Sequence, residues 1–165
     1  ANDKDRNYKL LGELEGLPTE QRGAHYVCAV CCVFPDGSKL TAEGYTVKDM
    51  GAYDGSSSHY PDYAKAVCEN VQKDGDSAFG ILICGTGIGM SMCANKYDGI
   101  RAAVCGDTFS ARFTRLHNDA NIMCLGGRVI GPGVGCELAD LFVDTEFEGG
   151  RHQRRVDMVM AIEEK

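Results

Sequence analysis

The feature that most constrains the fold is a regular alternation of short apolar segments and helical patterns that begins at Tyr45. Each apolar segment is followed by Gly or Asp and then by residues with helical spacing. Near-continuous apolar strands that alternate with helices indicate a parallel sheet covered on both faces. We therefore predict an α/β fold with strands at 45–47, 79–84, 100–105 and 122–125 and helices at 60–72, 89–96, 108–116, 136–143 and 150–165. Ligands of such sheets bind beyond the carboxyl ends of the strands.

Length and charge narrow the range of functions. The chain has 165 residues, of which 24 are acidic and 17 are Lys or Arg, so its formal net charge is −7. This length is typical of one domain. The acidic balance argues against nucleic acid as a partner, because a sequence-independent binder needs a basic face. The longest apolar run, residues 27–34, is too short to cross a membrane, and residues 1–9 lack the apolar part of a signal peptide. We expect no membrane segment.

The nine cysteines predict free thiols rather than a disulfide framework. Their number is odd and most lie in apolar runs, as expected of small hydrophobic residues in a reducing compartment, so we expect a cytoplasmic protein. Cys28 and Cys31 have the spacing of a redox or zinc motif. In a strand they would point to opposite faces, and no second Cys/His pair completes a site. We therefore expect core cysteines and no metal.

The most informative segment is a strand that ends at Cys84 and continues through Gly85-Thr86-Gly87-Ile88-Gly89 into a helix. Successive N–H groups of such a loop can face one anionic atom. A nucleotide phosphate loop fails, because Met90 stands where Lys is needed. A dinucleotide site stays open, because Asp107 lies 22 residues after Gly85. The third interpretation is an oxyanion-stabilising loop beside a reactive Cys84 whose thiolate form the backbone dipoles favour; the alternative is a buried cysteine that closes a strand.

Two further segments carry candidate residues. His117 follows a predicted helix, and we expect it at the same edge of the sheet as the glycine loop, where it could act as a general acid or base; alternatively, it only caps the helix. Arg151 and Arg155 are one turn apart near the start of the last predicted helix, a spacing suited to gripping a phosphate. A solvated basic helix start is the alternative, which the helix dipole disfavours.

In their order and identity, these motifs resemble one enzyme family. From Tyr45 onward the chain is similar to the type B ribose-5-phosphate isomerases, whose superfamily includes the galactose-6-phosphate isomerase subunits. The resemblance rests on residues 60–64, 83–91, 94–96, 99–102, 117–121, 126–131 and 148–156. It implies a flavodoxin-like, three-layer α/β/α fold with a mainly parallel sheet in the order 2-1-3-4-5. It also implies a homodimer or tetramer with a shared active site, a sugar-phosphate substrate and no cofactor.

The resemblance assigns roles to single residues. Cys84 would be the base that moves a proton between C1 and C2 of the sugar, and His117 would open the furanose ring. Thr86 and the loop amides would stabilise the enediolate, whose charge develops only during the reaction. The remaining substrate-binding residues would be the loop glycines Gly85, Gly87 and Gly89, Asn118 for sugar hydroxyls, Tyr60 as a pocket wall, Arg128 as an assisting residue, and Arg151 and Arg155 for the phosphate, reaching a neighbouring subunit's site.

The first 44 residues depart from this family. Its members open with a strand that ends in Gly-Ser/Cys-Asp-His-x-Gly, and no Asp-His pair occurs in this chain. Residues 2–44 instead resemble an internal fragment of the non-standard purine NTP pyrophosphatases, at 5–11, 17–18, 22–28 and 35–37. The nucleotide-binding ends of that family are absent, so we transfer none of its activity. The expected organisation is a foreign-looking, β-rich segment at 1–44, with a short helix and a hairpin, followed by an isomerase domain at 45–165.

The missing first strand matters because it would be central in the sheet. Its loss would expose ladder groups and apolar faces. We predict that residues 27–34, which are apolar on both sides, occupy this position. The connection that follows them is short for a crossover to a parallel neighbour, so an antiparallel or displaced arrangement is also open.

Together, these expectations predict an aldose–ketose isomerase. It would convert ribose 5-phosphate to ribulose 5-phosphate by enediolate proton transfer with a Cys base. Three alternatives stay open: a catalytically impaired sugar-phosphate-binding or dimerisation module, a galactose-6-phosphate isomerase subunit, and a nucleotide-binding domain. The first follows from the missing Asp-His motif. The second is less favoured, because a Cys base with an intact loop and His fits a self-sufficient isomerase better.

Overall fold

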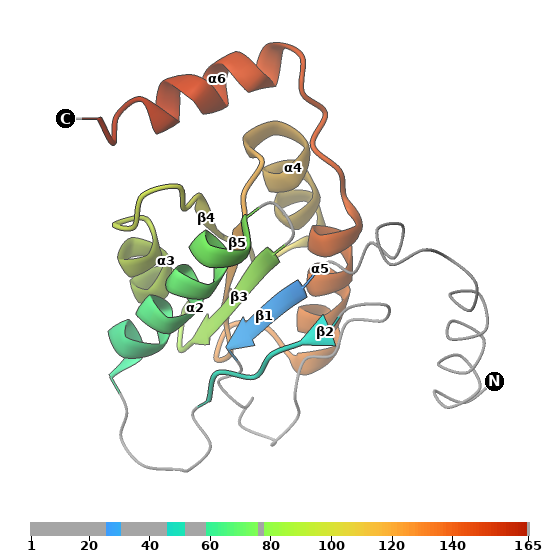
Figure 1. The fold of residues 1–165 in the computed structure, drawn as a ribbon. Coiled ribbons are helices and arrows are strands. Elements are labelled where there is room, and N and C mark those ends of the chain that lie inside the picture. Colours follow the sequence, from blue (N-terminus) through green and yellow to red (C-terminus); the bar gives the residue numbers. More distant parts are fainter. Residues whose placement is uncertain (1–25, 31–45, 52–58, 76–77, 165) are drawn as a thin grey trace, which may run out of the picture.

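The computed structural model describes residues 26–30, 46–51, 59–75 and 78–164. A five-stranded parallel sheet lies between two layers of helices, as Figure 1 shows, which confirms the predicted α/β fold. The strands are β1 (Tyr26–Val30), β2 (Thr46–Val47), β3 (Ala78–Cys84), β4 (Ala102–Val104) and β5 (Ile122–Gly126). The helices are α2 (Tyr60–Asp74), α3 (Ile88–Ala94), α4 (Thr108–Asn118), α5 (Pro132–Asp144) and α6 (Arg151–Met160).

The strand order is β2-β1-β3-β5-β4, and every pair is parallel. The expected order 2-1-3-4-5 was therefore wrong at one end of the sheet, where β5 lies inside and β4 forms the edge. Burial gives the physical reason. All five residues of β5 are buried, whereas all three residues of β4 are partly exposed. A short strand that keeps contact with solvent fits an edge.

β1 occupies an interior position of the sheet, between β2 and β3. Tyr26 pairs with Thr46 of β2 on one side and with Ala78 of β3 on the other, both in parallel register. This is the position that the sequence analysis assigned to residues 27–34, and the arrangement is parallel rather than antiparallel or displaced. Residues 31–34, the predicted N-terminal helix and the hairpin turn lie outside the described residues.

The two faces of the sheet form two core clusters because side chains alternate along each strand. On β3, Phe79, Ile81 and Ile83 pack towards α4 and α5, whereas Leu82 packs towards α2 and α3. Gly80 lets α2 approach the sheet closely, since a Cβ there would lie 2.7 Å from Val67 Cγ1. This close packing fixes β3 against α2.

The last helix, α6, lies beside α4 and away from the sheet (Figure 1). Val156 is buried, but Val159 and Ile162 of the same segment are more than half exposed. Much of the apolar side of this segment is therefore uncovered in the single chain. None of the helices in the described parts of the chain is both long and apolar enough to cross a membrane.

Candidate active site

The loop between β3 and α3 brings a backbone amide to the sulfur of Cys84. The Gly87 N–H donates a hydrogen bond to Cys84 Sγ at 3.2 Å. Gly87 has a φ of 78°, which a glycine adopts without strain. A Cβ at this position would also lie 3.1 Å from the carbonyl carbon of Leu125. The glycine is therefore required both by the turn and by its packing against β5.

The loop after β5 is tied to the same place. The Gly127 N–H donates to the Cys84 carbonyl at 2.8 Å, and the Arg128 N–H donates to the Gly85 carbonyl at 3.1 Å. The Arg128 side chain lies against Gly85, where a Cβ would be 3.6 Å from Arg128 Cδ. Arg128 itself is exposed. The fold thus brings this predicted phosphate-assisting residue to the glycine loop.

Tyr60 and Thr86 complete this group. Tyr60 begins α2, and its half-exposed ring packs on Gly89, because a Cβ there would lie 2.8 Å from the ring carbon Cζ. Thr86 is exposed in the loop between β3 and α3, and its Oγ1 accepts a hydrogen bond from the Ile88 N–H at 3.4 Å. The structure therefore gathers seven predicted residues at the carboxyl edge of the sheet: Tyr60, Cys84, Gly85, Thr86, Gly87, Gly89 and Arg128.

Burial separates Cys84 from the core cysteines. Desolvation by burial raises the pKa of Cys68 and of Cys105 to about 12, and it also raises the pKa of Cys124. These thiols stay protonated and packed in the two cores. Cys84 is partly exposed at the end of its strand. It is therefore accessible to a small molecule.

The other predicted residues form a second group around a cavity of about 310 Å³. His117, Asn118 and Arg155 line it, together with residues of the α3–β4 connection, such as Arg101, and residues of β4. Arg151 lies one turn before Arg155 on α6 and is exposed. A cavity with the Arg155 guanidinium, an imidazole and an amide at its wall suits an anionic, hydroxyl-rich ligand.

The expectation that His117 shares a sheet edge with the glycine loop was wrong. The helix α4 runs back against the strand direction, so its last residues lie where β5 begins. There, the Gly80 N–H donates to the Asn121 carbonyl at 2.8 Å. Cys84 lies four residues further along β3, about 13 Å at the rise of a parallel strand. Within one chain, His117 therefore lies at the end of the sheet where the strands begin, and Cys84 lies at the opposite end, where they finish.

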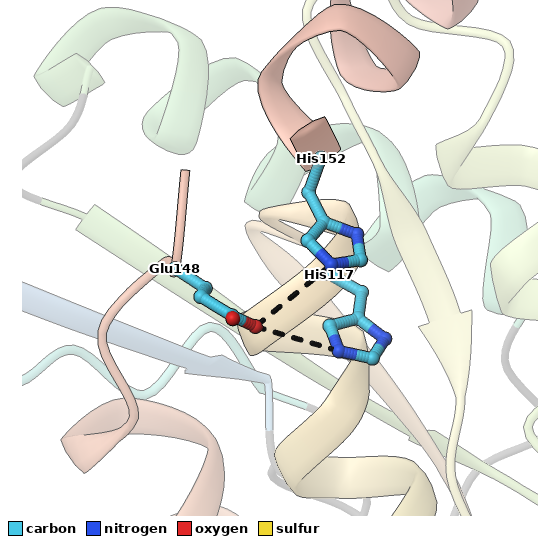
Figure 2. Close-up of side chains that lie close together, drawn as sticks. All are labelled: His117, Glu148 and His152. Carbon is cyan, nitrogen blue, oxygen red and sulfur yellow. Dashed lines mark ion pairs between the residues drawn. The ribbon is translucent and has the colours of Figure 1, made fainter. Parts of the chain in front are cut away.

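His117 belongs to a compact cluster with Glu148 and His152, which Figure 2 shows. Glu148 Oε2 lies 3.6 Å from His117 Nε2 and 3.8 Å from His152 Nε2. The two imidazole rings stack with centroids 4.0 Å apart and planes 4° apart. Sequence reasoning missed Glu148 and His152 as functional residues, although their i, i+4 spacing next to Arg151 was a usable signal.

The environment of His152 keeps it neutral. The side chain is buried, and burial is the largest cause that lowers its pKa, followed by the charges of His117 and Arg151. The Arg151 Nε–H donates a hydrogen bond to His152 Nε2 at 3.2 Å, and His152 Nδ1 has no hydrogen-bond partner within the described part of the chain. An imidazole that accepts a hydrogen bond from a guanidinium carries its own proton on the other nitrogen.

The ligand atoms of His117, Glu148 and His152 lie within 4.8 Å of one another, so a metal ion has to be considered. Two observations disfavour one. Face-to-face rings point their nitrogen lone pairs side by side rather than at one ion, and the neighbouring Arg151 adds positive charge. The geometry fits a cluster of stacked rings beside a carboxylate better than a metal centre.

Comparison with known proteins identifies the family. The family model for Ribose/Galactose Isomerase matches residues 37–159. The chain belongs to this family. Over 118 residues (71% of the chain and 78% of the relative) it is 57% identical to YwlF of Bacillus subtilis, named as a sugar phosphate isomerase. It is 43% identical over 126 residues to the ribose-5-phosphate isomerase B of Escherichia coli, covering 76% of this chain and 84% of that one.

Solved structures agree with this assignment. The ribose-5-phosphate isomerase B of Mycoplasma genitalium with bound ribulose-5-phosphate superposes with a TM-score of 0.77 at 36% identity, covering 85% of this chain and 96% of that one. The family match begins at residue 37, ahead of the expected boundary at residue 45. The resemblance of residues 2–44 to the purine NTP pyrophosphatases gains no support from these matches, and the division of the chain at residue 44 stays a prediction.

Proposed function

We propose that the protein is an aldose–ketose isomerase that interconverts ribose 5-phosphate and ribulose 5-phosphate. The observation that carries the proposal is the partly exposed Cys84, whose sulfur accepts a hydrogen bond from the Gly87 N–H in a glycine loop. Family membership and the names of the relatives from Escherichia coli and Mycoplasma genitalium support the same reaction class.

The proposed chemistry is a proton transfer between neighbouring carbons. The Cys84 thiolate takes the C2 proton of the open-chain aldose, the C–H electrons form a C1=C2 double bond, and the carbonyl oxygen O1 becomes negatively charged. The thiol then returns the proton to C1, while the proton of the O2 hydroxyl passes to O1, so that O2 becomes the ketone oxygen and O1 becomes a hydroxyl. The exposed Thr86 hydroxyl and the loop amides would face the charge that develops on the enediolate.

The ring-opening and phosphate-binding residues would come from a second copy. His117, Asn118 and Arg155 lie at the opposite sheet edge from Cys84 in one chain, so a complete site requires two chains. Exposed apolar side chains at Met92, Val104 and Phe109 are available for such an interface. In the two-chain site, His117 would open the furanose ring and the arginines Arg151 and Arg155 would hold the phosphate.

The decisive experiment measures conversion of ribose 5-phosphate by the purified full chain. Cys84→Ser is expected to lower kcat roughly a hundredfold or more, because it removes the proton-transfer base. Cys93→Ser is the matched control, since Cys93 is also a partly exposed free thiol but lies within α3, outside the loop. Turnover that survives Cys84→Ser would refute the assigned base.

A complementation experiment tests the shared site. Cys84→Ser and His117→Ala chains are each expected to be nearly inactive alone. When the two are co-expressed, mixed dimers would contain one site with both residues intact, so part of the activity should return. If the mixed preparation stays as inactive as the separate variants, Cys84 and His117 act in the same chain or not at all.

A catalytically impaired sugar-phosphate-binding module is the second candidate function. The chain after β1 continues as Cys31-Cys32-Val33-Phe34, where the family pattern has Asp-His. Calorimetric binding of ribulose 5-phosphate without measurable turnover by the wild type would favour this module over the isomerase.

The preferred sugar and the compartment are also proposals. Two relatives are named for other sugar phosphates: D-erythrulose-4-phosphate isomerase (46% identity) and galactose-6-phosphate isomerase subunit (37%). Turnover of a panel of four-, five- and six-carbon sugar phosphates therefore tests the sugar preference.

The compartment is supported by the thiols. The six described cysteines are free, which supports a reducing compartment such as the cytoplasm.

A further inference from the structure

We propose that Glu148 and His152 are positioning residues for the proposed isomerase: together they fix the ring orientation and the tautomer of His117. The inference rests on the proposed function, in which His117 opens the sugar ring. Neither residue needs to touch the substrate, because both act on the imidazole that does.

The ring of His117 is held on two sides. His152 stacks on it with centroids 4.0 Å apart and planes 4° apart, and the Phe113 ring meets it edge-on at 4.9 Å. His152 is only 2% exposed, so it is a fixed wall rather than a mobile neighbour. The Arg151 Nε–H occupies its Nε2, which leaves the proton on Nδ1 and the ring neutral. A neutral ring can stack on His117 without charge repulsion.

Glu148 determines which nitrogen of His117 carries the proton. Its Oε2 faces both Nε2 atoms, but His152 Nε2 already accepts from Arg151 and has no hydrogen to give. The Glu148 carboxylate can therefore accept a hydrogen bond only from a hydrogen on His117 Nε2. The separation of 3.6 Å is longer than a hydrogen bond, and such contacts commonly tighten when a substrate is bound. His117 Nδ1 is then the nitrogen that remains for the sugar.

The charged groups around the cluster agree with this assignment. Arg151 and Arg155 on α6 are its cations, and Glu148, in the segment before α6, is its anion. From α4, the facing groups are His117 itself and the uncharged Phe113. Glu148 is therefore the acceptor that can hold the His117 Nε2–H.

Nitrogen NMR of the ¹⁵N-labelled full chain tests the tautomer independently of activity. Above the titration range of histidine, the wild type is expected to show His117 with its hydrogen on Nε2. Glu148→Ala should shift His117 to a mixture of tautomers, whereas Glu148→Gln keeps an acceptor and should preserve most of the Nε2–H form. Glu146→Ala is the matched control, since it removes an exposed carboxylate two residues away. An unchanged His117 tautomer in Glu148→Ala would overturn the role of Glu148.

A second experiment separates ring opening from proton transfer. Ribulose 5-phosphate is acyclic, because its O5 carries the phosphate. Exchange of its C1 hydrogen with deuterium oxide therefore needs the Cys84 step but no ring opening. Glu148→Ala and His152→Ala should lower the kcat for ribose 5-phosphate roughly ten- to hundredfold, with exchange within about threefold of wild type. His152→Phe keeps a flat stacking ring and should recover most of the turnover.

The outcomes are distinguishable. If exchange and conversion fall together in correctly folded variants, Glu148 and His152 have a merely structural role, and if neither falls, His117 needs no positioning; both results refute the proposal. A wild type with neither exchange nor conversion refutes the proposed function instead, and the NMR result then decides the positioning by itself.

Discussion

Replacing Gly87 with alanine tests the central feature of the site, the loop amide that faces the Cys84 sulfur. The left-handed backbone at a φ of 78° costs an alanine about 1 kcal/mol. Its Cβ would also lie 3.1 to 3.2 Å from the backbone of Cys124 and Leu125 in the fully buried β5, which cannot move aside easily. Overpacking of this kind adds about 2 kcal/mol. We therefore expect a loss of about 3 kcal/mol in the free energy of unfolding.

Gly99→Ala is the matched control. Gly99 has nearly the same φ of 76°, but a Cβ there meets nothing within 4 Å. This variant should lose only the backbone contribution of about 1 kcal/mol. Urea denaturation followed by circular dichroism, at equal protein concentration, compares the free energies of unfolding. The difference between the two variants isolates the contact with β5.

The same substitution should also affect catalysis. A shifted Gly87 no longer directs its N–H at Cys84 Sγ, so deuterium exchange at C1 of ribulose 5-phosphate should slow roughly tenfold or more. Gly99→Ala should leave this exchange unchanged. If Gly87→Ala were as stable and as fast in exchange as Gly99→Ala, the argument that β5 packing aims the amide at the sulfur would be refuted.

Two further predictions concern the junction between α4 and β5 and the buried histidine. Asp119, at a φ of 46°, binds Arg101 and Arg115 through charge-assisted hydrogen bonds of 2.9 and 2.7 Å. Asp119→Ala should lower the free energy of unfolding by about 2 to 3 kcal/mol, since two such bonds are lost from a carboxylate that is partly screened by solvent; Asp119→Asn, which tolerates this backbone, should lose less in the same denaturation assay. The lowered pKa of His152 means that the unfolded chain takes up a proton near pH 6.5 while the folded chain does not. Stability should therefore fall as the pH drops below about 6.5, and His152→Phe should flatten this part of the curve; an unchanged pH dependence would contradict the buried neutral state.

Much of the site could be anticipated from local patterns. The strand that ends at Cys84, the glycines that follow it and the paired arginines near the start of α6 are contiguous features, so neighbours in the chain are neighbours in space. Glu148 and His152 were overlooked because their role depends on His117, which approaches them from α4 across a gap of some thirty residues in the sequence.

The alternation of apolar strands with helices was sufficient to determine the layers, because the period of side chains is a property of each segment alone. It could not determine which strand lies at the edge, since that depends on how much solvent contact each strand keeps once all are assembled. It did imply the position of His117, since a helix that returns along a parallel sheet carries its last residues to the end where the next strand begins, but our prediction did not apply this rule. The structure shows this separation of His117 from Cys84, and the separation is the reason to expect two chains in one site.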